Sequence, residues 1–295
     1  MMQKIGFIGL GIMGGPMAAN LVRAGYDVTG YARSSTSTDR LLQAGCKPAG
    51  SIEESVSGAD VVITMLPDSP QVVEVVLEPG GVLDCAGDDL LLIDMSTIAP
   101  ETSVAVANAA QAKGTRVLDA PVSGGEQGAI EASLSIMVGG ESDVFETGRP
   151  VLEHLGKTIV HVGGHGAGQT VKAANQLMVA GIISLVSEAM VLLEASGVDG
   201  ERAIEVLAGG LAGNRILDRK AATMLAREFA PGFRIDLHHK DMGIALASAR
   251  SAGVALPVTG VVAQLVASAR AMGYGSLDHS ALLNVVEKLS GRESR

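Results

Sequence analysis

The sequence predicts an α/β fold class, with an N-terminal doubly wound sheet, a long interdomain helix and an all-α C-terminal domain. Three observations predict it. Short apolar segments alternate with helical patterns up to about residue 164, a long uncharged helical segment follows, and strand-like segments then stop. Such alternation is typical of a mostly parallel sheet covered by helices. Because 295 residues suffice for about two domains, we expect boundaries at 1–164, 165–195 and 196–295.

Short aliphatic segments, often bounded by glycine, proline or aspartate, indicate the strands of the first domain. They are Lys4–Ile8, Asp27–Tyr31, Asp60–Thr64, Leu90–Asp94, Val117–Asp119, Leu134–Val138 and Thr158–Val162. Helical patterns lie between most of them, around Met17 and Leu21 and at Ser69–Leu77, Pro100–Lys113 and Glu141–Leu155. Ligands of a doubly wound sheet bind at the carboxyl ends of its strands. We therefore expect one site from the segments Gly9–Gly14, Met65–Pro67, Ser96–Thr97 and Ser123–Gly125.

The second domain shows helical patterns alone, which predicts an all-α domain. They cover Gly200–Ala208, Ile216–Ala226, Leu237–Ser251, Gly260–Met272 and Ser280–Leu289.

The charge and the reactive residues exclude several classes of function. A formal net charge of −10 argues against nucleic acid or an anionic membrane as a partner, because both bind clustered lysine and arginine. The two cysteines and six histidines form no spacing typical of a metal site. We expect no metal, and the absence of a signal-peptide pattern at Met1–Lys4 favours the cytoplasm.

The segment Gly166–Ala195 predicts one long helix that separates the two domains. Its run between Lys172 and Glu188 has no charged residue and is shorter than the ~20 apolar residues that cross a membrane. A helix that is apolar nearly all round is buried from several sides in a soluble protein. Lys172 and Asn175 lie three residues apart, hence on one face near its start.

A glycine-rich turn follows the first strand and precedes the first helix. Gly9 permits the tight turn, Gly11 lets the backbone approach a pyrophosphate, and Gly14 permits close packing of helix and strand. The helix N-terminus, with Ile12 and Met13 before it, offers free N–H groups to phosphates. The alternative is a glycine turn with no ligand. The context favours a Rossmann-like NAD(P)-binding domain over 1–164.

The end of the second strand bears on the choice of cofactor. NAD-binding domains usually place an acidic residue there, against the ribose 2′-hydroxyl. Here the strand continues as Tyr31–Ser35, and Asp27 lies at its other end. Arg33 can pair with a 2′-phosphate, and Ser34 and Ser35 add hydroxyl donors. We favour NADP, with NAD as the alternative if Arg33 is only a solvated turn residue.

Four segments resemble the β-hydroxyacid dehydrogenase family, which includes the 3-hydroxyisobutyrate dehydrogenases, and the resemblance spans the whole chain. Gly6–Leu21 is similar to the extended cofactor signature of that family, and Asp119–Gly125 to its substrate-binding segment. Gly166–Gln176 is similar to its catalytic segment, and Lys240–Asp241 to a late Lys-Asp pair. The resemblance implies that Lys172 is catalytic and that Lys240 approaches the cofactor.

The family's reaction transfers a hydride between nicotinamide and a small hydroxy acid. Lys172 is placed to donate the proton, since a helix N-terminus and partial burial both lower a lysine pKa. A lysine that extends to solvent is the alternative. Asn175 can hold a substrate hydroxyl or carboxylate without adding charge. Ser123 with the N–H groups of Gly124 and Gly125 can hold a carboxylate, although the same residues also suit a plain turn.

The position of further residues follows from strand-end geometry and from the family. Met65, Leu66 and Thr97 are expected beside the cofactor. The paired charges of Lys240 and Asp241 could instead form a surface pair. We expect a small carboxylate-bearing substrate and a homodimer or homotetramer, with 196–295 as the substrate and oligomerisation domain.

Within the family, Gly209–Asn214, Pro231–Lys240 and Asp278–Leu282 are most similar to tartronate semialdehyde reductases. This similarity implies reduction of 2-hydroxy-3-oxopropionate to D-glycerate. Oxidation of 3-hydroxyisobutyrate or a serine-like acid is the near alternative. A non-catalytic NADP-binding protein is the alternative of another class.

Overall fold

The computed structural model describes residues 3–33, 39 and 42–292. Its contacts divide the chain into two units, Met1–Lys172 and Ala173–Arg295, which are taken separately below. Ser34 and Ser35, expected near the cofactor, lie outside the described residues, as do Met1 and Met2.

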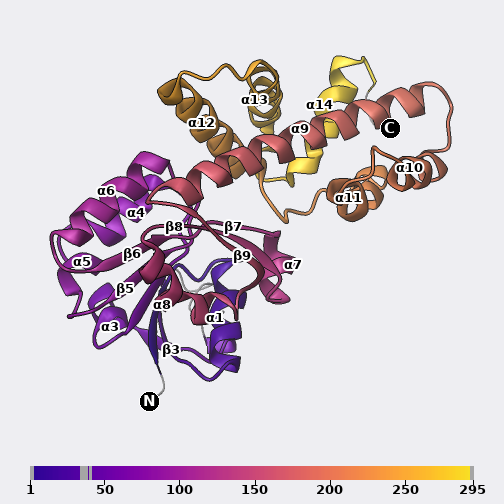
Figure 1. The fold of residues 1–295 in the computed structure, drawn as a ribbon. Coiled ribbons are helices and arrows are strands. Elements are labelled where there is room, and N and C mark those ends of the chain that lie inside the picture. The colour runs from indigo at the N-terminus through magenta and orange to yellow at the C-terminus, as the bar shows by residue number, and fades with distance from the viewer. Residues whose placement is uncertain (1–2, 34–38, 40–41, 293–295) are drawn as a thin grey trace. The chain divides into compact units, whose positions relative to one another are not determined.

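A mixed sheet with helices on both faces forms the first unit, which confirms the predicted doubly wound domain (Figure 1). The strand order is β3-β2-β1-β4-β5-β6-β8-β7, and β9 pairs with β8. The first six strands in this order are parallel, and the order 3-2-1-4-5-6 is typical of dinucleotide-binding sheets. The next strand, β8, is antiparallel to β6. The strands are β1 Lys4–Ile8, β2 Asp27–Tyr31, β3 Lys47–Ala49, β4 Val61–Thr64, β5 Leu91–Asp94, β6 Arg116–Asp119, β7 Val122–Ser123, β8 Leu134–Gly139 and β9 Gly156–Gly163.

Alternation along the central strands builds two apolar layers, one on each face of the sheet. In β4, Val61 and Ile63 belong to one hydrophobic cluster and Val62 to the other. The first cluster includes side chains of α1, α7 and α8, and the second includes side chains of α3, α4, α5 and α6. The helices of this unit are α1 Gly14–Arg23, α3 Ile52–Val56, α4 Ser69–Val76, α5 Val82–Cys85, α6 Pro100–Gln111, α7 Gly125–Ile130 and α8 Ser142–Leu152.

Helix α9, Ala167–Ala195, begins in the first unit and continues into the second. It has 29 residues, and its most apolar window has a mean hydropathy of 2.0. Our expectation that the segment is too short to cross a membrane is therefore wrong, because the helix is long enough and apolar enough to do so. We expected the helix to be buried from several sides, and 44% of the residues in that window are buried. Core helices of soluble proteins can be equally long and apolar, so these two properties are weak evidence for a membrane span.

The second unit is helical, as predicted. Its core joins Ile183 of α9 to Met242 of α12, Val266 of α13 and Leu282 of α14. Among its described residues, the one β-bridge is isolated and joins Arg234 to Asp278. The elements after α9 are α10 Gly200–Gly209, α11 Arg215–Leu225, α12 Ile235–Ala252, α13 Pro257–Ala269, a π-turn at Arg270–Tyr274, a 3-10 turn at His279–Ala281 and α14 Leu282–Leu289.

Candidate active site

The glycine turn after β1 has the geometry that its sequence predicts. Gly9 has φ +100°, a conformation that favours glycine, and a side chain there would collide with the Met65 carbonyl oxygen. A side chain on Gly14 would collide with the Gly9 carbonyl oxygen. The turn therefore depends on both glycines, and it holds the loop after β4 against the loop after β1.

The space beside this turn fits a dinucleotide phosphate. A Cβ built on Gly11 meets no atom within 4 Å, so the backbone there faces open space. Helix α1 starts at Met13–Gly14 with no side-chain cap and no acidic residue in its first turn. Pro16 has no N–H group, and the Gly15 amide donates to the Gly11 carbonyl at 3.0 Å. The amides that can face an anion at this helix end are therefore those of Met13 and Gly14, and the dipole favours an anion there. Gly11, Ile12, Met13 and Gly14 would hold the pyrophosphate.

The loops after β4 and β5 are tied together by hydrogen bonds. The Leu66 amide donates to Ser96 Oγ at 2.9 Å, and the Ala99 amide donates to Ser69 Oγ at 3.0 Å. Met65 and Leu66 are half-buried, as is Thr97. The structure therefore places the predicted cofactor residues of both loops on one connected framework. Their contact with a cofactor stays a prediction.

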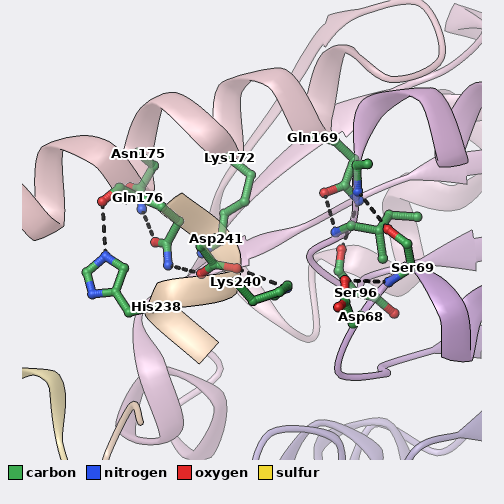
Figure 2. A network of polar contacts seen from close by, with 12 residues as sticks. Asp68, Ser69, Ser96, Gln169, Lys172, Asn175, Gln176, His238, Lys240 and Asp241 are labelled. Atoms are coloured by element: carbon green, nitrogen blue, oxygen red, sulfur yellow. Dashed lines mark hydrogen bonds and ion pairs between the residues drawn. The ribbon is translucent and has the colours of Figure 1, made fainter. Parts of the chain in front are cut away.

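Gln169 of α9 holds the loop on either side of Thr97 (Figure 2). Its Nε2 donates to the Ser96 carbonyl at 2.8 Å, and its Oε1 accepts from the Ile98 amide at 3.1 Å. The side chain is 1% exposed. Sequence reasoning placed Gln169 inside the catalytic segment but gave it no role, since a buried glutamine is not distinguishable from a surface one by spacing.

Two buried carboxyl groups lie side by side at the ends of β5 and β6, where Asp94 pairs with Asp119 in register. Burial raises the pKa of Asp94, although hydrogen bonds from Ser96 and Thr64 oppose the rise. Burial also raises the pKa of Asp119, opposed by hydrogen bonds from the amides of Gly166 and Gln169. Both acids thus organise strand-end loops from within the protein.

Asp119 caps the N-terminus of α9. Its Oδ1 accepts from the Gly166 amide at 2.8 Å, and its Oδ2 accepts from the Gln169 amide at 3.2 Å. An acidic group at a helix N-terminus satisfies amides that have no partner within the helix. The carboxylate therefore fixes where α9 begins and, with it, the position of Lys172.

Lys172 reaches the predicted substrate segment. It is 6% exposed, and its Nζ donates to the Val122 carbonyl at 2.6 Å. Val122 precedes Ser123, which ends the short strand β7. Gly124 and Gly125 have φ +139° and +66°, which explains why two glycines follow. The first unit thus joins Lys172 to Ser123–Gly125, and the alternative of a lysine extended into solvent is excluded.

One argument for the chemistry of Lys172 needs correction. Helix α9 begins at Ala167, so Lys172 lies in its second turn and not in the first. The effect of the dipole falls off within the first turn, and the Asp119 carboxyl group sits at that helix end. The helix dipole therefore gives little support to the proton-donor role of Lys172, which is buried and bonded to the Val122 carbonyl.

The other two predicted residues belong to the second unit, where a chain of polar contacts joins them (Figure 2). Asn175 Nδ2 donates to Gln176 Oε1 at 2.8 Å, and Gln176 Nε2 donates to the Asp241 carboxylate. Lys240 Nζ lies 2.9 Å from the other Asp241 oxygen. Gln176 and Asp241 are 4% and 2% exposed. The Lys240–Asp241 pair is therefore largely buried, against the alternative of a surface pair.

A second polar cluster supports this chain. His238 Nε2 lies 3.1 Å from the Gln176 carbonyl oxygen, and the Nδ1 atoms of His238 and His279 are 3.0 Å apart. Burial acts to raise the pKa of Asp278, but His279, Lys220 and hydrogen bonds hold it well below its usual value. Isolated histidines gave no sign of this pairing in the sequence.

Arg33 follows β2 and forms an ion pair with Glu74. Its Nη1 is 3.2 Å from both carboxylate oxygens of Glu74 on α4. Both side chains are more than half exposed, at 57% and 58%, so the pair is weak. The guanidinium can leave Glu74 at little cost.

Other possible sites do not compete with these residues. One cavity of about 430 Å³ is lined by residues between Met190 and Arg227, and another of about 350 Å³ by residues between Ala107 and His165. Neither is lined by a predicted site residue. Within the described part of the chain, no three His, Cys, Asp or Glu side chains form a group that could hold a metal ion.

Two known families match consecutive parts of the chain. Residues 4–163 match the NAD binding domain of 6-phosphogluconate dehydrogenase, and residues 166–286 match a domain described as NAD-binding of NADP-dependent 3-hydroxyisobutyrate dehydrogenase. Together these matches cover both units.

Similar proteins extend over nearly the full chain. The 2-hydroxy-3-oxopropionate reductase of Escherichia coli K12 is 42% identical over 291 residues, 99% of each chain. The 3-hydroxyisobutyrate dehydrogenase of Pseudomonas aeruginosa is 40% identical over 264 residues, 87% of this chain and 89% of its own. The solved Mycobacterium tuberculosis 3-hydroxyisobutyrate dehydrogenase with L-serine has a TM-score of 0.87 at 36% identity, over 97% and 99% of the two chains. The protein therefore belongs to the 3-hydroxyisobutyrate dehydrogenase-like family of NAD(P)-dependent β-hydroxyacid dehydrogenases.

Proposed function

We propose that the protein is a 2-hydroxy-3-oxopropionate reductase that converts tartronate semialdehyde to D-glycerate with NADPH. The observation that carries the proposal is the 42% identity, over 99% of both chains, to an enzyme of that name. The placement of Lys172 against the Val122–Ser123 strand supports the same reaction. The family fixes the reaction class, and this similarity favours the substrate.

The reduction adds a hydride and a proton across the aldehyde. Bound NADPH supplies the hydride to the aldehyde carbon. Lys172 donates its proton to the carbonyl oxygen, which becomes the new hydroxyl group, and the neutral amine regains a proton from solvent. Ser123 and the amides of Gly124 and Gly125 bind the substrate carboxylate, and Asn175 contacts the substrate.

Several residues would bind the cofactor in this proposal. The Gly9–Gly14 turn would hold the pyrophosphate, and Met65, Leu66, Thr97 and Lys240 would contact the cofactor as well. Arg33 exchanges Glu74 for the 2′-phosphate, which favours NADP over NAD.

The test is a steady-state panel of semialdehydes and β-hydroxy acids with NADPH and with NADH. We expect the highest kcat/KM for tartronate semialdehyde with NADPH. Turnover of 3-hydroxyisobutyrate or L-serine in its place would favour the second candidate, which the Pseudomonas relative and the Mycobacterium structure with L-serine support. Cofactor binding without turnover of any of these compounds would leave a non-catalytic NADP-binding protein.

We also propose that the protein assembles as a homodimer or homotetramer in the cytoplasm. Met178, Leu185 and Leu192 of α9 are 61%, 66% and 68% exposed. Their seven-residue spacing places them on one helix face, and an apolar stripe of this kind suits a second copy of the chain. Light scattering after size exclusion should show that Leu185→Lys lowers the assembled mass. Leu289→Lys, at an equally exposed leucine of α14, is the control.

A further inference from the structure

Asn175 has an amide that can face a ligand in two ways, and the two ways recognise different groups. Its oxygen accepts a hydrogen bond, so it can bind a hydroxyl group. Its nitrogen donates, so it can bind a carboxylate. Which end is offered to the substrate therefore affects what the site selects.

The contacts of the second unit settle the orientation of Gln176 first. Asp241 carries the ion pair with Lys240 at 2.9 Å, so its oxygens act as acceptors. The amide group of Gln176 that meets Asp241 must then be Nε2, the donor. Its Oε1 consequently faces the other way.

The orientation of Gln176 in turn settles that of Asn175. Gln176 Oε1 can only accept, so Asn175 must present Nδ2 to it, at 2.8 Å. Asn175 Oδ1 is turned away, and it receives no hydrogen bond from the residues that the structure describes. Asn175 is half-buried, while Gln176 and Asp241 are almost fully buried.

The main chain of Gln176 is held as well. The Gln176 carbonyl oxygen can only accept, so His238 Nε2 donates to it at 3.1 Å. His238 is 0% exposed and pairs with His279. The glutamine is thus held at both its backbone and its side chain. A half-turn of its side-chain amide would break the bonds to Asp241 and from Asn175.

We propose that Gln176 and Asp241 are positioning residues that make Asn175 a hydrogen-bond acceptor for a substrate hydroxyl group. This inference rests on the proposed function, and it gives Asn175 an acceptor, Oδ1, to which a substrate hydroxyl group can donate and a carboxylate cannot. The site then favours semialdehydes with a 2-hydroxyl group over those with hydrogen or methyl at that carbon.

The experiment compares kcat/KM for tartronate semialdehyde and for malonate semialdehyde, which lacks the 2-hydroxyl group. We expect wild-type protein to favour the first. In Gln176→Leu and Asp241→Asn the ratio should fall about tenfold, as expected for one lost hydrogen bond, because the Asn175 amide can then turn over. The matched control is Gln264→Leu, at an exposed glutamine of α13, which should keep the wild-type ratio.

The selectivity ratio separates positioning from a general loss of activity, because damage to the fold lowers both rates together. An unchanged ratio in folded Gln176→Leu and Asp241→Asn proteins that bind NADPH would overturn the inference. So would a wild-type protein that turns over both compounds equally well.

A measurement without turnover separates this inference from the proposed function. Proton exchange of the Gln176 side-chain amide can be followed by NMR in the full chain with NADPH. Slow exchange in wild type that becomes fast in Asp241→Asn supports the positioning role, even if no semialdehyde is reduced and the proposed function fails. Fast exchange in the wild type overturns the role, whatever the protein catalyses.

Discussion

Two buried glutamines of α9, seven residues apart, are satisfied in different ways. The side chain of Gln169 in the first unit bonds to main-chain groups, the Ser96 carbonyl and the Ile98 amide. Gln176 in the second unit bonds through its side chain to other side chains, Asn175 and Asp241. Both are almost fully buried, so each needs its partners.

The difference shows that a buried side-chain amide can be oriented either by main-chain groups or by a charged side chain. Main-chain donors and acceptors are present whatever the sequence, so the amide of Gln169 is oriented by the course of the chain. The amide of Gln176 is oriented by the carboxylate of Asp241, which one substitution can remove. We therefore expect changes around Gln169 to alter stability, and changes around Gln176 to alter selectivity.

The largest effect is expected at Lys172, which also donates to a main-chain group of the first unit, the Val122 carbonyl. Lys172→Met removes the proposed proton donor but keeps most of the apolar stem. We expect kcat to fall by ~10²–10⁴, the range for loss of a general acid, with NADPH affinity within about threefold of wild type. Stopped-flow reduction and fluorescence titration measure the two. A kcat near that of wild type would remove Lys172 from the chemistry.

Gln169→Leu tests the main-chain side of the comparison. The change leaves the Ser96 carbonyl and the Ile98 amide buried without this partner. The loss of a buried hydrogen-bond partner costs ~1–3 kcal/mol of stability for each group. We expect the free energy of unfolding to fall by about 3 kcal/mol, and the melting temperature by roughly 5–10 °C. Calorimetry measures both. If Gln176→Leu lowers the melting temperature as much, the contrast between the two glutamines is wrong.

Asp278→Asn tests whether the charge of a buried carboxylate contributes to the stability of the second unit. The native pKa of Asp278 is lowered below its unfolded value, so its charge stabilises the fold above about pH 4. This contribution is lost as the pH falls through the native pKa. We expect the variant to be less stable by ~1–2 kcal/mol at pH 7.

The pH series gives the control for this prediction. Urea unfolding at pH 7, 5, 4 and 3 should show a difference between wild type and Asp278→Asn that is constant down to pH 5 and shrinks below about pH 4. A difference that does not change with pH would mean that shape, and not the charge paired with Lys220 and His279, is what the carboxylate contributes.

The smallest effect is expected at Arg33, whose contact with Glu74 is exposed. Arg33→Ala should lower the ratio of kcat/KM for NADPH over NADH about tenfold, as for one lost bond to a charged group. Glu74→Gln releases the arginine and should raise kcat/KM for NADPH by about two- to fivefold, which corresponds to the free energy of an exposed ion pair. An unchanged ratio in Arg33→Ala would return the choice of cofactor to NAD.

The sequence predicted the main elements of the fold well, because apolar periodicity carries them. It missed β3 and β7, with three and two residues, since segments so short have no periodicity to read. It predicted Lys172 and Asn175 as site residues, but it placed Lys172 one helical turn too early and gave Gln169, Gln176 and Asp119 no role.

What the sequence by itself determined is local or depends on residue type. The glycine turn after β1, the longer strands and their order along the chain, the long helix and the missing acid after β2 all follow from neighbouring residues. The family followed from four segments that match in order.

Only the tertiary structure decided the partners of the buried polar groups. Asp119 accepts from the amide of a residue 47 positions later, just before α9, and Asp241 orients a glutamine 65 residues before it. No spacing rule links residues so far apart. A buried polar group must find a partner wherever the packed chain supplies one, and that supply depends on how the elements pack.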